Sequence, residues 1–181
     1  MALNPSLDSI EALYRKLERE SYRAYHAKSR THKADHLYNF CITAHSLRDY
    51  FIERKNLKGE DKKKQIQSWN TNEALVAVAE IANTSKHFTL RDYKTKRPKT
   101  PGTKSFIQKK GKFIDVYANN AGEIETYLVE GQDCMITLAS GKKYNLYLFT
   151  KEVLEYWRSF LKANDIRIVR QPLRRLIDGA T

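Results

Sequence analysis

The sequence has few of the residues and runs that mark disulfide-stapled or membrane-spanning proteins. Its 181 residues include two cysteines, seven glycines and four prolines. Cys41 and Cys134 lie far apart and outside any C-x-x-C pair, which argues against a disulfide framework and a zinc knuckle. No apolar run approaches the roughly 20 residues of a membrane helix, and the charged, amphipathic N-terminus is unlike a signal peptide. We therefore expect a cytoplasmic protein that makes no contact with a membrane.

Motifs of several enzyme classes are also missing from the sequence. The glycines form no phosphate-binding loop, dinucleotide fingerprint or G-x-S-x-G elbow. The five histidines show neither the H-E-x-x-H spacing nor a Cys-His spacing of known metal sites. We therefore predict no metal site and no cofactor.

Positive charge is abundant. The chain has 33 Lys and Arg residues against 21 Asp and Glu, which gives a formal net charge of +12. Such a surface attracts polyanions over a Debye length of about 8 to 10 Å. Nucleic acid, with RNA favoured, is the partner that this charge predicts. The alternatives are an acidic protein partner, or lysines that only keep the protein soluble.

The first half of the sequence is predicted to be helical. Apolar residues recur at three- and four-residue steps over residues 8–28 and 35–54, and Asp35 would cap the second helix. The segment "KNLKGEDKKKQ" breaks this pattern and predicts a solvated loop or a frayed helix start. A third helix is expected from about Asn70. Together these three long helices would form an N-terminal helical bundle over residues 1–90.

The second half of the sequence changes period. A basic linker, 91–104, contains Pro98 and Pro101 and should lack regular structure. Five short β-rich runs follow, with Lys110-Gly111, "NNAG", "EGQD" and "SGK" between them as turn material. They predict an antiparallel five-stranded β-meander, followed by a C-terminal helix from about Thr150 and a basic tail, all within 105–181. The fold class is therefore expected to be α+β, as one compact domain or as these separate parts.

The polar face of the first helix combines cations with aromatic residues. It carries Arg15, Lys16, Arg19, Arg23, Glu18, Glu20, Tyr14, Tyr22 and Tyr25. The apolar face of the same helix is expected to be part of the core.

A candidate catalytic cluster lies in the stretch "EIANTSKHFTL", residues 80–90. If the helix continues through it, Asn83 and His87 lie one turn apart, with Lys86 beside them. An imidazole, an amide and an ammonium group in that arrangement could act on a phosphodiester. The alternative is ordinary helix-end chemistry, because Lys and His favour the negative end of the helix dipole.

The motif Asn83-x-x-x-His87 resembles the R-N-x-x-x-H signature of the HEPN superfamily of small helical ribonucleases and nucleotide-binding proteins. The resemblance covers residues 8–90 and departs at Ala82, which stands where the family has arginine. It implies a helical homodimer, a role in bacterial or phage defence or toxin systems, and metal-independent cleavage of RNA. Without the arginine, either another cation substitutes for it, with Lys86, Arg48, Arg91 and Arg30 as candidates, or the protein binds RNA without cleaving it.

Two other pairs match the looser family spacing of an arginine four to six residues before a histidine. They are Arg30 with His36 and Arg19 with His26. A further pair, His45 and Asp49, could form an oriented imidazole beside Arg48 or a structural contact.

Nucleic-acid binding is the leading functional hypothesis from the sequence, with a metal-independent endoribonuclease and a protein-interaction factor as alternatives. The predicted phosphate-binding residues are Arg91, Lys94, Lys96, Arg97, Lys99, Lys104, Arg170, Arg174 and Arg175. Aromatic residues interleaved with the first six would stack on unpaired bases.

Overall fold

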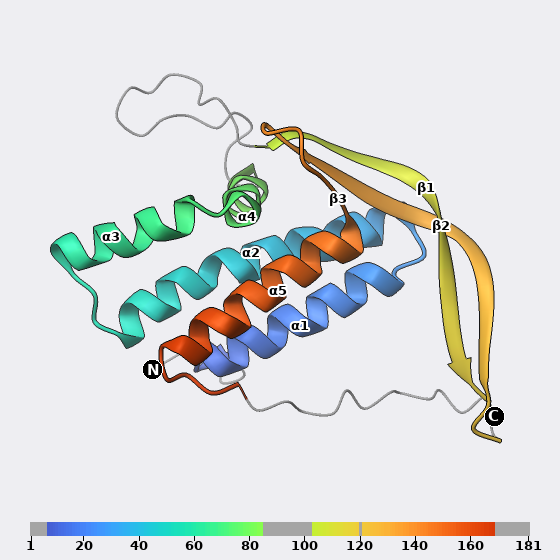
Figure 1. Cartoon of the computed structure of the whole chain (residues 1–181), viewed down its shortest axis with the longest axis horizontal. Coiled ribbons are helices and arrows are strands. Elements are labelled where there is room, and N and C mark those ends of the chain that lie inside the picture. Colours follow the sequence, from blue (N-terminus) through green and yellow to red (C-terminus); the bar gives the residue numbers. More distant parts are fainter. Residues whose placement is uncertain (1–6, 85–102, 120, 169–181) are drawn as a thin grey trace.

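The computed structural model describes residues 7–84, 103–119 and 121–168 (Figure 1). Within them the chain is α+β, with five helices and an antiparallel sheet of strand order β1-β2-β3. The elements are α1 (Ile10–His26), α2 (Arg30–Arg54), α3 (Gly59–Asn70), α4 (Glu73–Thr84), β1 (Thr103–Ala118), β2 (Ile124–Leu138), β3 (Lys143–Asn145) and α5 (Leu146–Ala163).

The prediction of three N-terminal helices was wrong, because four helices precede the strands of the described chain. The segment expected to be a solvated loop contributes to α3. The helix expected from Asn70 begins instead at Glu73, because the Asn72 side chain accepts a hydrogen bond from the Leu75 backbone N–H at 3.0 Å. That capping bond starts a new helix after a two-residue break. The N-cap of α2 is Ser29, not Asp35.

The prediction of five strands was also wrong, since two long strands replace four short ones. Lys110-Gly111 and "EGQD" were expected to be turns, but they lie within β1 and β2, where Gly111 pairs with Gly131 near the middle of the ladder. Paired glycines leave no side chains there, and the hairpin bends about midway along its length (Figure 1). The "NNAG" segment does form the turn of the hairpin, with Gly122 at φ +82°.

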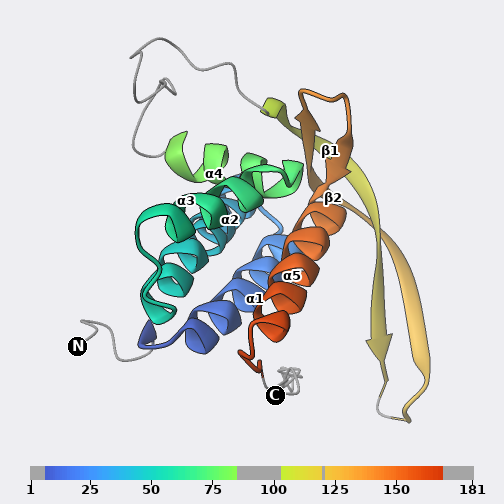
Figure 2. The same cartoon turned by 60° about the vertical axis from the view of Figure 1, so that its left-hand side comes forward.

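The core lies where α5 returns to the helices. Figures 1 and 2 show α1, α2 and α5 side by side, with α5 running back from the sheet. Trp157 of α5 packs against Trp69 of α3 with ring centroids 5.8 Å apart, and Phe160 lies 4.8 Å from Phe51 of α2. Both cysteines are buried, and burial raises the pKa of the Cys41 thiol far above its usual range. None of the described helices is both long and apolar enough to cross a bilayer.

Candidate nucleic-acid interface

The predicted catalytic cluster falls at the edge of the described chain. Asn83 lies half-buried in the last turn of α4, whereas Lys86 and His87 lie outside the described residues. Of the predicted phosphate-binding residues, Lys104 belongs to β1. The others, Arg91, Lys94, Lys96, Arg97, Lys99, Arg170, Arg174 and Arg175, also lie outside the described residues.

Ala82 is a core residue. Its side chain is 5% exposed and belongs to the main hydrophobic cluster, on the buried face of α4. The position that matches the family's arginine therefore points into the protein, where a guanidinium could not reach a phosphate.

Arg48 is also buried and forms structural contacts. Its guanidinium donates to the Asn70 Oδ1 atom at 3.2 Å and to the Leu75 carbonyl at 3.1 Å, and it lies 5.6 Å from the centre of the Trp69 ring. Burial lowers the pKa of Arg48, but a guanidinium stays charged in proteins and so needs these acceptors. Arg48 holds the junction of α3 and α4 and is not available as a substitute phosphate clamp.

Exposed cations and aromatic rings gather instead where α1 ends and α2 begins. Along α1 the exposed residues Arg19, Tyr22, Arg23 and His26 recur at three- and four-residue steps and so share one face of the helix. Lys28 and Arg30 extend this face through the connection into α2, and both are exposed. We call these six residues the α1–α2 surface.

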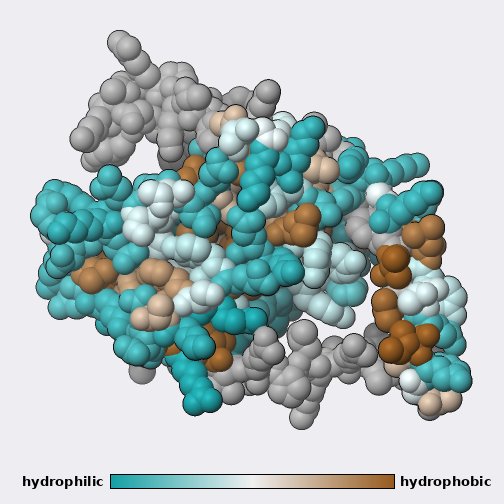
Figure 3. Space-filling model, viewed as in Figure 1, coloured by the Kyte–Doolittle hydropathy of each residue, from teal (hydrophilic) through white to brown (hydrophobic). Residues whose placement is uncertain are grey.

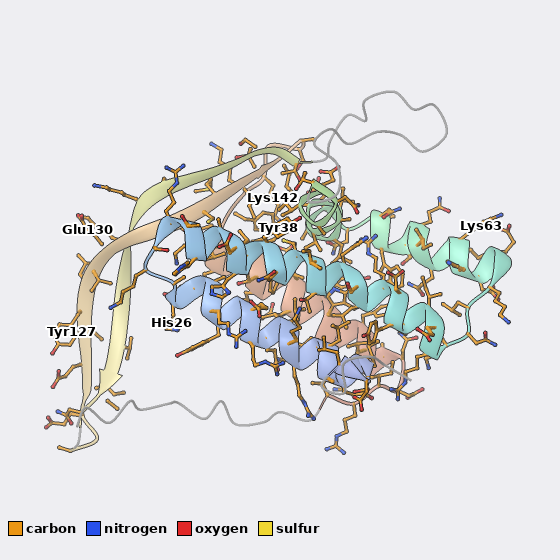
Figure 4. The ribbon with its side chains drawn as sticks, turned by 180° about the vertical axis from the view of Figure 1, so that it is seen from behind. His26, Tyr38, Lys63, Tyr127, Glu130 and Lys142 are labelled. Atoms are coloured by element: carbon orange, nitrogen blue, oxygen red, sulfur yellow. The ribbon has the colours of Figure 1, made fainter. Side chains whose placement is uncertain are left out.

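Aromatic contacts order the end of this surface. The ring of Tyr22 lies 4.1 Å from that of His26, and Tyr25 lies 5.1 Å from His26 on its other side. Tyr25 also contacts Tyr147 of α5 at 6.1 Å. Tyr22 and Tyr147 are both about half exposed. Figure 4 shows His26 at the end of the α1 helix, beside the hairpin. The arrangement offers ring faces next to guanidinium groups, as stacking on unpaired bases requires.

A buried carboxylate links the two helices beneath this surface. Glu20, on the inner side of α1, lies 3.1 Å from His36 Nδ1 and accepts a hydrogen bond from Arg23 at 2.8 Å. His36 is half-buried, so one edge of its ring is fixed by a carboxylate while part of it meets solvent. A carboxylate that orients an imidazole is a common device for general acid-base catalysis. Of the looser Arg-His spacings, the pair ending at His36 gains this support.

The sequence analysis placed Tyr14 and Glu20 on the exposed face of the first helix, but both are buried. The Tyr14 hydroxyl donates to the Leu154 carbonyl at 3.1 Å, which draws the ring into the contact between α1 and α5. The pairing of Glu20 with His36 was missed. Sequence did hold one signal for it, because His32 and His36 lie four residues apart on α2 and so share a helix face.

Lys33 is the buried cation of this region. Its ammonium donates to the carbonyl oxygens of Ala24 and Tyr25, at 2.9 and 2.7 Å, and so binds the C-terminal end of α1. Burial lowers the pKa of Lys33 from its ordinary value of 10.5, with Cys134 and Asp133 of β2 opposing the shift. Lys33 therefore fixes the end of α1 that carries Tyr25 and His26.

We expect Lys33→Met to lower the free energy of unfolding by about 2 kcal/mol near neutral pH, because two buried carbonyl groups lose a charged donor. The loss should grow with pH. The unfolded chain, with the higher pKa, binds more protons than the folded chain between the two pKa values, so wild-type stability rises with pH there. Urea unfolding of both proteins from about pH 7 to about pH 10 measures the difference. A difference that shrinks with rising pH would contradict the assignment.

Comparison with protein-family models, with curated proteins and with solved structures found no match to this chain. In the described part of the chain, no group of three His, Cys, Asp or Glu side chains is placed to hold a metal ion.

Proposed function

We propose that the protein binds nucleic acid, with single-stranded RNA favoured, through the α1–α2 surface. The observation that carries this proposal is the run of exposed residues Arg19, Tyr22, Arg23 and His26 on one face of α1. Cations there would contact phosphates and the rings would stack on bases. A preference for RNA follows from the open, exposed rings, because RNA-binding proteins mainly recognise unpaired bases.

Local charge supports the choice of this surface. Glu18 and Glu20, the acids nearest to it on α1, are each bound to a cation, by Arg158 at 2.9 Å and by Arg23 at 2.8 Å. Their negative charge is thus neutralised, while Arg19, Lys28 and Arg30 stay exposed. The surface would present a positive potential to a polyanion.

We expect the double variant Arg19→Gln/Arg30→Gln to bind a labelled single-stranded RNA more weakly and with a smaller salt dependence. Loss of two phosphate contacts should reduce the slope of log K against log salt by about 1.4. Fluorescence anisotropy across a salt series measures both quantities.

The matched control is Lys62→Gln/Lys64→Gln, which removes the same charge from α3. Figure 4 shows Lys63 of that helix at the opposite end of the molecule from His26. We expect this control to keep the wild-type slope. Equal slopes for all three proteins would contradict the proposed surface, because the binding would then depend only on net charge.

A metal-independent endoribonuclease is the second candidate function, and the contact between Glu20 and His36 favours it. An imidazole held by a carboxylate could take a proton from a 2′-hydroxyl, and Arg30, at the start of the same helix, could compensate phosphate charge. Asn83, Lys86 and His87 remain the alternative residues for this activity.

For this candidate we expect His36→Ala to slow cleavage of single-stranded RNA by about 100-fold or more, with chelator present throughout. His32→Ala, an exposed neighbour on α2, is the control and should cleave at the wild-type rate. A wild-type rate in His36→Ala together with loss in His87→Ala would move the activity to the end of α4.

A further inference from the structure

The distal half of the hairpin, residues 113–130, extends away from the helices, and we call it the arm (Figures 1 and 2). Four aliphatic residues of the arm are strongly exposed: Ile114 at 61%, Val116 at 62%, Ile124 at 74% and Leu128 at 68%. Figure 3 shows apolar residues gathered along the arm, with an open space between them and the helical body. Soluble monomers seldom leave such a contiguous apolar surface uncovered.

The strand register places these residues on a single uncharged face. Ile114 pairs with Leu128, Val116 with Thr126 and Ala118 with Ile124, so all six share one side of the ladder. By the same alternation, this side continues into Cys134 and Ile136, which are buried against the helices. The face is thus the outer continuation of a core face, beyond the reach of the described helices.

The charge of the arm argues against nucleic acid or an anionic membrane as its cover. Residues 113–130 contain Asp115, Glu123, Glu125 and Glu130 and no lysine or arginine, in a chain of net charge +12. The base of the hairpin is basic in contrast, with exposed Lys109, Lys110 and Lys112. The hairpin is therefore polarised along its length, from basic base to acidic tip.

This polarity fits a second copy of the chain. The apolar face lies between Lys112 at its base and Glu123 in the turn at its tip. Two arms packed face to face and antiparallel about a two-fold axis would bury the apolar residues of both. The acidic tip of each arm would then lie over the lysines of the other. Such an interface is isologous, and it would add a second layer to a two-stranded ribbon that is marginally stable alone.

We propose that the arm is a homodimerisation element, in which the face of Ile114, Val116, Ile124 and Leu128 packs against the same face of a second copy. The proposal does not depend on the proposed function, because the dimer forms without nucleic acid. It assigns the dimer contact to the hairpin and leaves the α1–α2 surface open.

Sedimentation velocity on nuclease-treated protein, from about 1 to about 100 μM, tests the proposal. We expect the mass to rise with concentration from 21.1 kDa toward twice that value. Ile114→Thr/Leu128→Thr should weaken the dimer by roughly 30-fold or more, because the exposed face loses its two largest paired aliphatic groups. The control Tyr127→Thr, on the opposite face of β2, should change dimerisation by less than about threefold.

A charge-swap experiment tests the antiparallel arrangement. Lys109→Glu/Lys110→Glu and Glu123→Lys/Glu125→Lys should each weaken the homodimer, whereas an equimolar mixture should recover it, since both contacts are again attractive. A monomer at every wild-type concentration would overturn the proposal. So would a wild-type dimer that is insensitive to the apolar double variant.

Discussion

Ala82→Arg is expected to lower the free energy of unfolding by about 4 kcal/mol and to confer no ribonuclease activity. The Ala82 side chain is 5% exposed in the hydrophobic core, so the longer side chain must displace packed neighbours and carry its charge into an apolar region. Urea denaturation followed by circular dichroism measures the loss, and an RNA cleavage assay tests the second point.

Thr84→Arg is the matched control for this substitution. Thr84 is exposed in the last turn of the same helix, so an arginine there should change the free energy of unfolding by less than about 0.5 kcal/mol. If Ala82→Arg were as stable as this control and cleaved RNA, the motif with Asn83 and His87 would be a site that lacks only its arginine. The result expected here identifies Ala82 as a packing residue.

The second large effect is expected at Arg48. Arg48→Ala should lower the free energy of unfolding by about 3 kcal/mol, because it removes a buried stem packed on Trp69 and two hydrogen bonds that join α2 to α3 and α4. Urea denaturation measures the change. Arg48→Met restores the volume of the stem without the hydrogen bonds and should recover about half of the loss.

Arg54→Ala is the control for the loss of a positive charge from the same helix. Arg54 forms an exposed ion pair with Glu11 at 3.0 Å, which contributes less than about 1 kcal/mol. Equal losses at Arg48 and Arg54 would show that Arg48 has no special structural role.

Sequence periodicity predicted the parts of the fold that local chemistry decides. Three-residue and four-residue apolar spacing identified α1, α2 and α5, because each buries one face against the others. It missed the break between α3 and α4, which depends on whether the side chain of Asn72 caps a helix or faces solvent. It also mistook Gly111 for a turn residue, because a glycine that faces a glycine across a ladder looks the same in sequence as one that ends a strand.

The candidate interface could be predicted only in part for a related reason. The exposed Arg19, Tyr22 and Arg23 were already on the polar face that α1 was expected to show. The contact of Glu20 with His36 joins residues 16 positions apart on two helices, and that of Tyr25 with Tyr147 joins α1 to α5. Such contacts depend on how helices pack together, which the spacing of residues along one helix does not specify.

The central claim is that RNA binds to the α1–α2 surface, and ultraviolet cross-linking tests it most directly. The protein is irradiated with single-stranded RNA, and the cross-linked peptides are identified by mass spectrometry. We predict cross-links at Tyr22, Tyr25 or Tyr147, and their loss at high salt, where phosphate contacts weaken. Cross-links confined to the acidic arm, or none at low salt, would contradict the claim.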